Sequence, residues 1–209
     1  MTAQISDAVV YRGKPHSIAG INGSGLFDPT EHGIKSVMIS TACWRGYHCT
    51  YEVADDSLLL TQVNIGLGEE DRALAERGEG PKLFGHVPHR YTVHGYREDS
   101  TGVKTSWESH DFLYDGLRAV VPFTGGLLLA DDFIHELYVH MGFHPAWKFR
   151  EVHELLFEQG RVVKAADRSA EMAEFREMLA GRPMEPSDPR DQEEIVRWVE
   201  QCFSLKYRW

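Results

Sequence analysis

Two cysteines and a histidine lie close together in the stretch STACWRGYHCTYEV, residues 40–53. These are residue types that bind zinc or supply a thiolate nucleophile. On a continuous strand, Cys43 and Cys49 are held about 20 Å apart. In a hairpin that turns at Arg45-Gly46, their side chains point to opposite faces. Only an irregular loop would let them share an ion, so we interpret the stretch as strand and predict no metal ligands and no cofactor.

The densest group of histidines lies in HELYVHMGFHPAWKFREVHE, residues 135–154. HELYVH resembles the zinc-binding helix H-E-x-x-H, but its histidines are five residues apart instead of four. This spacing separates His135 and His140 by about 140° on a helix, and sends them to opposite faces of a strand. The sequence instead predicts a strand over 136–141, followed by a loop that carries an imidazole and aromatic rings.

These rings could also line a small-ligand site together with Trp44 and Arg45 of the first stretch. Ligand sites are lined by aromatic side chains with a few polar groups. An arginine clamps a carboxylate or phosphate, and a histidine acts as acid or base near neutral pH. The expected ligand-binding residues are Trp44, Arg45, Tyr138, His140, His144 and Trp147.

The established catalytic patterns that we sought are absent. The sequence has no G-x-S-x-G elbow, no phosphate-binding G-x-x-x-x-G-K-[ST] and no dinucleotide fingerprint that opens a helix. We assign no catalytic residue, and we leave open whether the protein is an enzyme, with the balance toward a noncatalytic role.

The elements that must position these side chains are mainly short strands. Apolar or alternating runs separated by turn residues predict hairpins over 7–20, 47–65 and 150–165. Their connections are too short for crossover helices, which favours antiparallel pairing in a β-sandwich or barrel. A short surface helix is expected within 66–81, with an acidic start at Glu69 and a stop at Gly78, and two amphipathic helices over the C-terminal forty residues.

The predicted fold class is therefore mainly β (α+β), an antiparallel sandwich or barrel with two C-terminal helices. We expect an antiparallel β domain over 1–166 and a helical segment over 167–209 packed on it. A weak internal similarity raises the possibility of two related hairpin units, about 25–66 and 83–134.

Composition excludes several classes of function. A formal net charge of −10 repels phosphate backbones, so we expect no nucleic-acid partner. No apolar run reaches the length of about 18 residues that spans a bilayer, so no membrane partner is expected. The N-terminus shows no secretory pattern and the three cysteines form no C-x-x-C pair, which predicts a cytoplasmic protein with reduced thiols.

By elimination, the first functional hypothesis is a noncatalytic acidic binding or inhibitory protein. Its charge, the acidic segment 69–79 and the amphipathic last helix favour docking to a more basic protein partner. The alternative is a small-ligand-binding β-barrel protein or enzyme that uses the His-, aromatic- and Arg-lined site described above.

Overall fold

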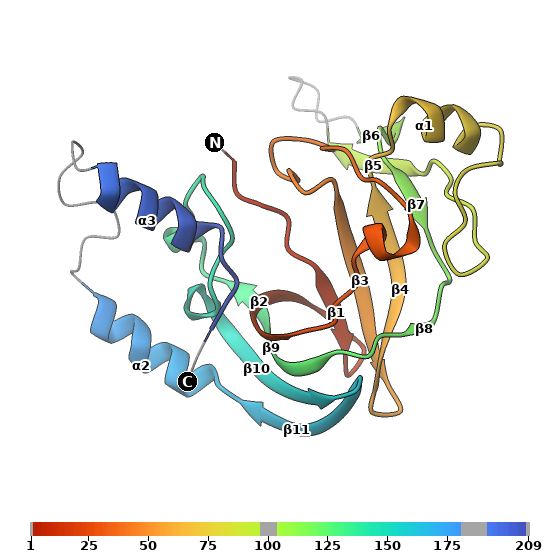
Figure 1. Ribbon diagram of the computed structural model, residues 1–209. Helices are drawn as coiled ribbons and strands as arrows, with labels where there is room; N and C mark the ends of the chain where they lie inside the picture. Colours follow the sequence, from red (N-terminus) through yellow and green to blue (C-terminus); the bar gives the residue numbers. More distant parts are fainter. Residues whose placement is uncertain (1, 97–103, 181–191, 208–209) are drawn as a thin grey trace. The chain divides into compact units, whose positions relative to one another are not determined.

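The computed structural model describes residues 2–96, 104–180 and 192–207. Over these residues the chain is mainly β, with a large, mostly antiparallel sheet and three α-helices, which confirms the predicted fold class (Figure 1). The strands are β1 (Ala8–Tyr11), β2 (Lys14–Ser24), β3 (Tyr47–Ala54), β4 (Ser57–Ile65), β5 (Thr92–Tyr96), β6 (Lys104–Glu108), β7 (Phe112–Tyr114), β8 (Ala119–Val120), β9 (Thr124–Phe133), β10 (Phe149–Glu158) and β11 (Arg161–Asp167). The helices are α1 (Glu69–Ala75), α2 (Ser169–Leu179) and α3 (Gln192–Cys202), with 3-10 turns η1 (Pro29–His32), η2 (His135–Leu137) and η3 (Ala146–Lys148).

The chain forms two compact units, each built from separate segments. Unit 1 comprises Met1–Leu26, Thr50–Leu59 and Val120–Trp209, and unit 2 comprises Phe27–Cys49 and Leu60–Ala119. The domain boundary expected near residue 166 stays a prediction.

The large sheet follows the strand order β11-β10-β9-β2-β1-β3-β4-β7. β1 runs parallel to β3, whereas β2, β9, β10 and β11 pair with antiparallel neighbours. Arg161 of β11 also pairs with Ser57 of β4. Within unit 1 the pairings therefore form a closed ring, which leaves fewer free strand edges.

The three predicted hairpins are confirmed, and the backbone at each turn explains their tight connections. Arg12 and Gly13 have φ of 52° and 77° between β1 and β2, and Asp55 and Asp56 have φ of 48° and 58° between β3 and β4. Positive φ at both central residues is the two-residue turn whose twist matches the flanking strands. Gly160 supplies a positive φ in the turn between β10 and β11.

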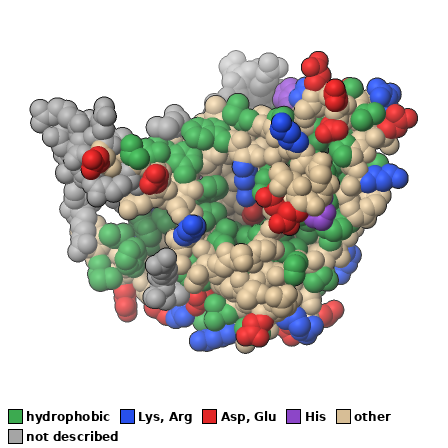
Figure 2. Space-filling view, in the orientation of Figure 1, with side chains coloured by type: hydrophobic (Ala, Val, Ile, Leu, Met, Phe, Trp, Pro, Cys, Tyr) green, Lys and Arg blue, Asp and Glu red, His purple; other side chains and the backbone are tan. Residues whose placement is uncertain are grey.

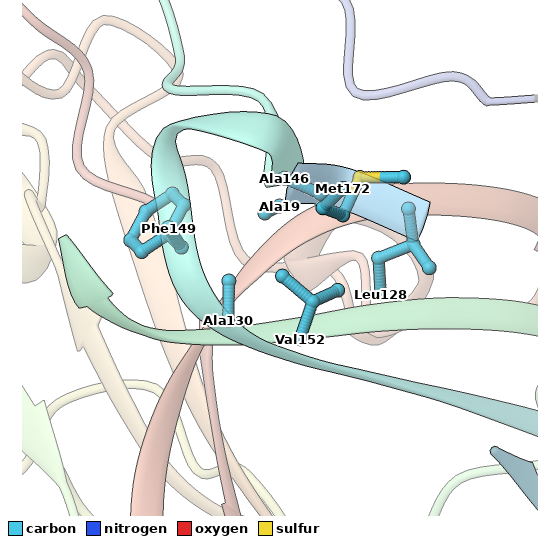
Figure 3. Close-up of a cluster of buried hydrophobic side chains, with 7 residues drawn as sticks. All are labelled: Ala19, Leu128, Ala130, Ala146, Phe149, Val152 and Met172. Carbon is cyan, nitrogen blue, oxygen red and sulfur yellow. The ribbon is translucent and has the colours of Figure 1, made fainter. Parts of the chain in front are cut away.

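One face of the unit 1 sheet is buried beneath helix α2. Figure 3 shows the side chains that pack there, from strands β2, β9 and β10, from η3 and from α2. They are Ala19, Leu128, Ala130, Ala146, Phe149, Val152 and Met172. Burial of this cluster fixes β9 and β10 against the helix and so determines which of their side chains face the other way.

The other face of the same strands is also apolar over most of its length. Leu127 and Leu129 of β9 and Leu155 of β10 are fully buried there. Glu151 and His153 alternate with Val152 along β10, so they share this second face with Leu155. Two polar side chains thus stand at one end of an apolar surface.

Unit 2 has a core of its own around Val63, Ile65, Phe112 and Tyr114, all buried. β4 and β7 pair there, and β5 and β6 form a separate two-stranded sheet. The surface helix predicted within 66–81 is present as α1, which begins at Glu69 as expected and ends at Ala75. None of the helices that the structure describes combines the length and apolar character needed to cross a bilayer.

Two local predictions are wrong. Residues 41–46 form turns, with β3 beginning only at Tyr47, because Gly46 has φ of 79° and the amide of Cys43 bonds the carbonyl of Ser40. The strand expected over 136–141 is instead η2 and an irregular loop. The backbone of this loop bonds non-sheet segments: the amide of Gln4 donates to the carbonyl of Gly142 at 2.7 Å.

The proposed internal similarity joins segments with different pairings. The earlier segment contains β3 and β4, which are neighbours in the sheet. In the later segment, β8 pairs with β4, whereas β9 pairs with β2 and β10.

Candidate metal centre

The side chain of His16 is almost completely buried, and the β1–β2 hairpin positions it. Only 3% of its surface is exposed. Its Nδ1 lies 3.0 Å from the carbonyl oxygen of Lys14. Because a carbonyl can only accept, Nδ1 carries the proton and Nε2 presents its lone pair. This Nε2 is buried and has no hydrogen-bond partner among the described residues.

Glu151 and His153 of β10 lie in front of that nitrogen. The Nε2 atom of His153 is 3.1 Å from Oε1 of Glu151, and the Nε2 atom of His16 is 3.8 Å from the same oxygen. One ligand atom from each of the three side chains lies within 4.8 Å of the other two. We call these three residues the His-Glu-His cluster.

The charges around Glu151 keep it in the form that binds metals. The hydrogen bond from His153 and the nearby charge of Lys14 hold the pKa of Glu151 below its ordinary value. The Nζ atom of Lys14 lies 3.6 Å from Oε2, the oxygen that does not face the imidazoles. Oε1 is therefore an ionised donor at neutral pH, as metal coordination requires.

The ring of Tyr11 packs against both imidazoles. Its centroid is 6.2 Å from that of His16 and 5.7 Å from that of His153, and the two imidazoles are themselves 5.7 Å apart. Glu151 and His153 are partly exposed, so solvent reaches the cluster from their side. Aromatic packing on one side and access on the other suit a site that holds its ligands still and admits an ion.

The spacing of the cluster fits a small transition-metal ion. Bonds of about 2.0–2.1 Å in tetrahedral geometry place ligand atoms roughly 3.4 Å apart. The two distances to Oε1 of Glu151, 3.1 and 3.8 Å, lie on either side of that value. All three ligand atoms lie within 4.8 Å of one another, and His16 is held in place by its bond to the carbonyl of Lys14.

Four of the six side chains predicted to bind a ligand belong to unit 1, and three of them meet. The ring of Tyr138 lies 4.8 Å from His140 and 5.1 Å from His144, measured between centroids. Trp147 packs against the core cluster beneath α2. Tyr138, His140 and His144 thus form an aromatic and imidazole group around the loop that follows η2.

The other two predicted residues belong to unit 2. Arg45 lies over the ring of Tyr47, with its guanidinium carbon 4.6 Å from the centroid, and its Nε donates to the carbonyl of Tyr47 at 2.6 Å. Trp44 is about half exposed. The assignment of all six residues to one ligand site stays a prediction.

No family model matches this chain. Comparison with curated proteins and with solved structures likewise finds no significant similarity. The function of this chain is therefore inferred from the geometry of its side chains.

The His-Glu-His cluster was not predicted from the sequence. Glu151 and His153 did carry a local signal, since two metal-ligand residue types two apart on a strand share one face. His16 carried none, because it lies far away in sequence and faces Glu151 only through the strand order β2-β9-β10.

Proposed function

We propose that this protein binds a divalent transition-metal ion through His16, Glu151 and His153. The observation that carries the proposal is the Nε2 atom of His16, which is buried, lacks a hydrogen-bond partner among the described residues and faces an ionised carboxylate and a second imidazole. Leaving a buried polar atom unpaired costs about 1–3 kcal/mol, and a coordinate bond would remove that cost.

The donor set indicates the class of metal. Two neutral imidazoles and one carboxylate suit zinc, ferrous iron or cobalt, whereas calcium and magnesium prefer sites made of oxygen alone. Three protein ligands also leave coordination positions open, as in catalytic metal sites and unlike four-ligand structural sites. The partly exposed side of the cluster is where a small oxygen-donor ligand would reach the bound ion.

Docking to a basic protein partner, the first hypothesis from the sequence, has weaker support. Figure 2 shows acidic and basic side chains interspersed over the face in view. Near α1, Glu76 accepts from Arg90 at 2.7 Å and Glu79 pairs with Arg77 at 3.4 Å, so the acidic segment is partly neutralised by its neighbours. The docking proposal predicts a complex in cell lysate that dissociates at high salt, and a particle that elutes as a lone monomer at every salt concentration would refute it.

The metal proposal is tested on protein that has been treated with EDTA and dialysed. Titration with zinc in a calorimeter should give one site per chain, and cobalt should give the visible absorption of a four- or five-coordinate ion. The variants His16→Gln, Glu151→Gln and His153→Gln each remove one donor. Each should weaken zinc binding at least about tenfold, which is the lower end of the loss seen when only a supporting residue is removed.

His110→Gln is the matched control, because His110 is an exposed histidine of unit 2. It should bind zinc like the unaltered protein. If all four variants bind equally, the zinc sits elsewhere and the assignment fails. Absence of any site-specific binding to the unaltered protein would refute the proposal directly.

A further inference from the structure

A second group of buried polar atoms lies in unit 1 and shares no residue with the His-Glu-His cluster. Both ring nitrogens of His144 are buried and have no hydrogen-bond partner within the described part of the chain. Water would satisfy each of them in an unfolded chain, so leaving them unpaired on folding is unfavourable. Native proteins keep few such atoms, and those that persist commonly have a functional reason.

Lys148 adds a buried charge to this group. It is 3% exposed, and burial lowers the pKa of its amine. Its Nζ lies 5.4 Å from the centroid of the Trp147 ring, a contact that stabilises a cation only partly. No carboxylate pairs with Lys148 among the residues that the structure describes. Burial is the main influence on the pKa of Lys148 and the nearby Cys202 opposes it, while the charge of Lys148 in turn lowers the pKa of His144. A largely buried cationic side chain without a counter-ion is costly, and an anion is the partner that would offset the cost.

Aromatic rings enclose His144. The centroid of Phe133 is 4.7 Å from the imidazole and that of Tyr138 is 5.1 Å away, while Phe149 lies 5.2 Å from Phe133. Tyr138 is 44% exposed, so the group reaches the surface on that side. Flat apolar walls next to a few polar atoms are typical of sites for small organic ligands.

The backbone around Lys148 is held from several directions. Its amide donates to the carbonyl of Pro145 at 3.0 Å, and its own carbonyl accepts from the amide of Ile134 at 2.9 Å. Arg176 of α2 donates through Nη1 to the carbonyls on either side, those of Trp147 and Phe149, both at 2.7 Å. The main chain that carries Lys148 is therefore fixed before any ligand arrives, which lowers the entropy cost of binding.

We propose that Lys148 and His144, with the rings of Phe133 and Tyr138, form a binding site for a small organic carboxylate that has an aromatic or apolar body. The carboxylate pairs with the ammonium of Lys148 and accepts a hydrogen bond from the His144 ring. Its body lies against the aromatic rings. This site and the metal centre use different residues, so either proposal can fail without the other.

Benzoate serves as the probe, and benzyl alcohol is its uncharged counterpart of similar size. Titrations are followed by tryptophan fluorescence and by calorimetry, in EDTA so that the metal centre does not contribute. The unaltered protein should bind benzoate saturably and at least about tenfold more tightly than benzyl alcohol, since a hydrogen bond to a charged group contributes about 1.5–3 kcal/mol.

The variant Lys148→Met removes the charge and keeps an unbranched apolar chain. It should weaken benzoate binding at least about tenfold and leave benzyl alcohol unaffected. The control is Lys164→Met, which alters an exposed lysine of β11 and should bind benzoate normally. His144→Phe provides a second test, because it fills the same space without the ring nitrogens and should also weaken benzoate binding.

Three results would overturn the proposal. They are no saturable benzoate binding by the unaltered protein, equal affinity for benzoate and benzyl alcohol, and unchanged benzoate binding by both Lys148→Met and His144→Phe. If Lys148→Met does not fold, the comparison of benzoate with benzyl alcohol and the His144→Phe variant still decide the question.

Discussion

Replacing His144 with phenylalanine should make the protein less sensitive to acid. Burial of the imidazole, with a smaller effect from the charge of Lys148, lowers the pKa of His144 from 6.5 to about 4. Between these two pH values the unfolded chain binds a proton that the folded chain does not, so stability falls as the pH drops from 6.5 to 4. The full difference corresponds to about 3 kcal/mol, and we expect about 2 kcal/mol because the residue is partly exposed.

Urea unfolding followed by circular dichroism, near pH 7 and near pH 4 in EDTA, measures this difference. Other ionisable groups are common to both proteins, so only the change in the difference between the two proteins is informative. With a urea dependence of about 2 kcal/mol per molar, the midpoint of the unaltered protein should fall by about 1 M more than that of His144→Phe. Equal shifts of the midpoint in the two proteins would show that His144 has the same pKa in the folded and the unfolded chain. That result would refute the reasoning.

Three further predictions concern other parts of unit 1. Zinc at about 100 times its dissociation constant should stabilise the protein by about 2.7 kcal/mol and raise its melting temperature by roughly 5–10 °C. A similar rise in the His153→Gln variant would contradict the proposed metal site. Glu154 is 4% exposed and accepts hydrogen bonds from Nε and Nη2 of Arg168 at 3.0 and 2.7 Å. Arg168→Met should therefore lower the free energy of unfolding, measured in urea, by about 3 kcal/mol. Most of that loss should be absent when Arg168→Met is introduced into the Glu154→Gln variant. Gly142 has φ of 69° and a Cβ there would collide with the carbonyl oxygen of Cys202, so Gly142→Ala should destabilise by about 1–3 kcal/mol, and an unchanged melting temperature would show that the loop moves freely.

The parts of the fold that the sequence predicted are those governed by neighbouring residues. The hairpin over 7–20 follows from alternating apolar residues around a turn, and both signals lie within a few residues of each other. The strand over 136–141 was predicted on the same grounds, from Tyr138 and Val139. It failed because a strand also needs a partner: the amides of Leu137 and Tyr138 bond the carbonyls of Ile134 and His135 in a tight turn, and the next residues, Gly142 and Phe143, bond the N-terminal region and the end of α3.

In the candidate sites too, the sequence predicts the association of residues that lie close together in the chain and not of those that the fold brings together. Tyr138, His140 and His144 lie within seven residues of one another, so their association could be anticipated from the sequence alone. Lys148 could not be singled out in that way, because its burial depends on the packing of η3 and α2 against the sheet. The His-Glu-His cluster depends on strand order over a long separation, which no local pattern specifies.

The bond between the His16 ring and the main chain of Lys14 has a consequence for how this centre can change. The acceptor is a peptide oxygen, which every amino acid supplies, so no replacement at position 14 deletes it. Altering the Lys14 side chain can tune the charge beside Glu151, yet the choice of which imidazole nitrogen faces the ion is made by the hairpin itself. Variation at position 14 would therefore change the affinity for a metal ion, while the direction from which His16 coordinates the ion would stay the same.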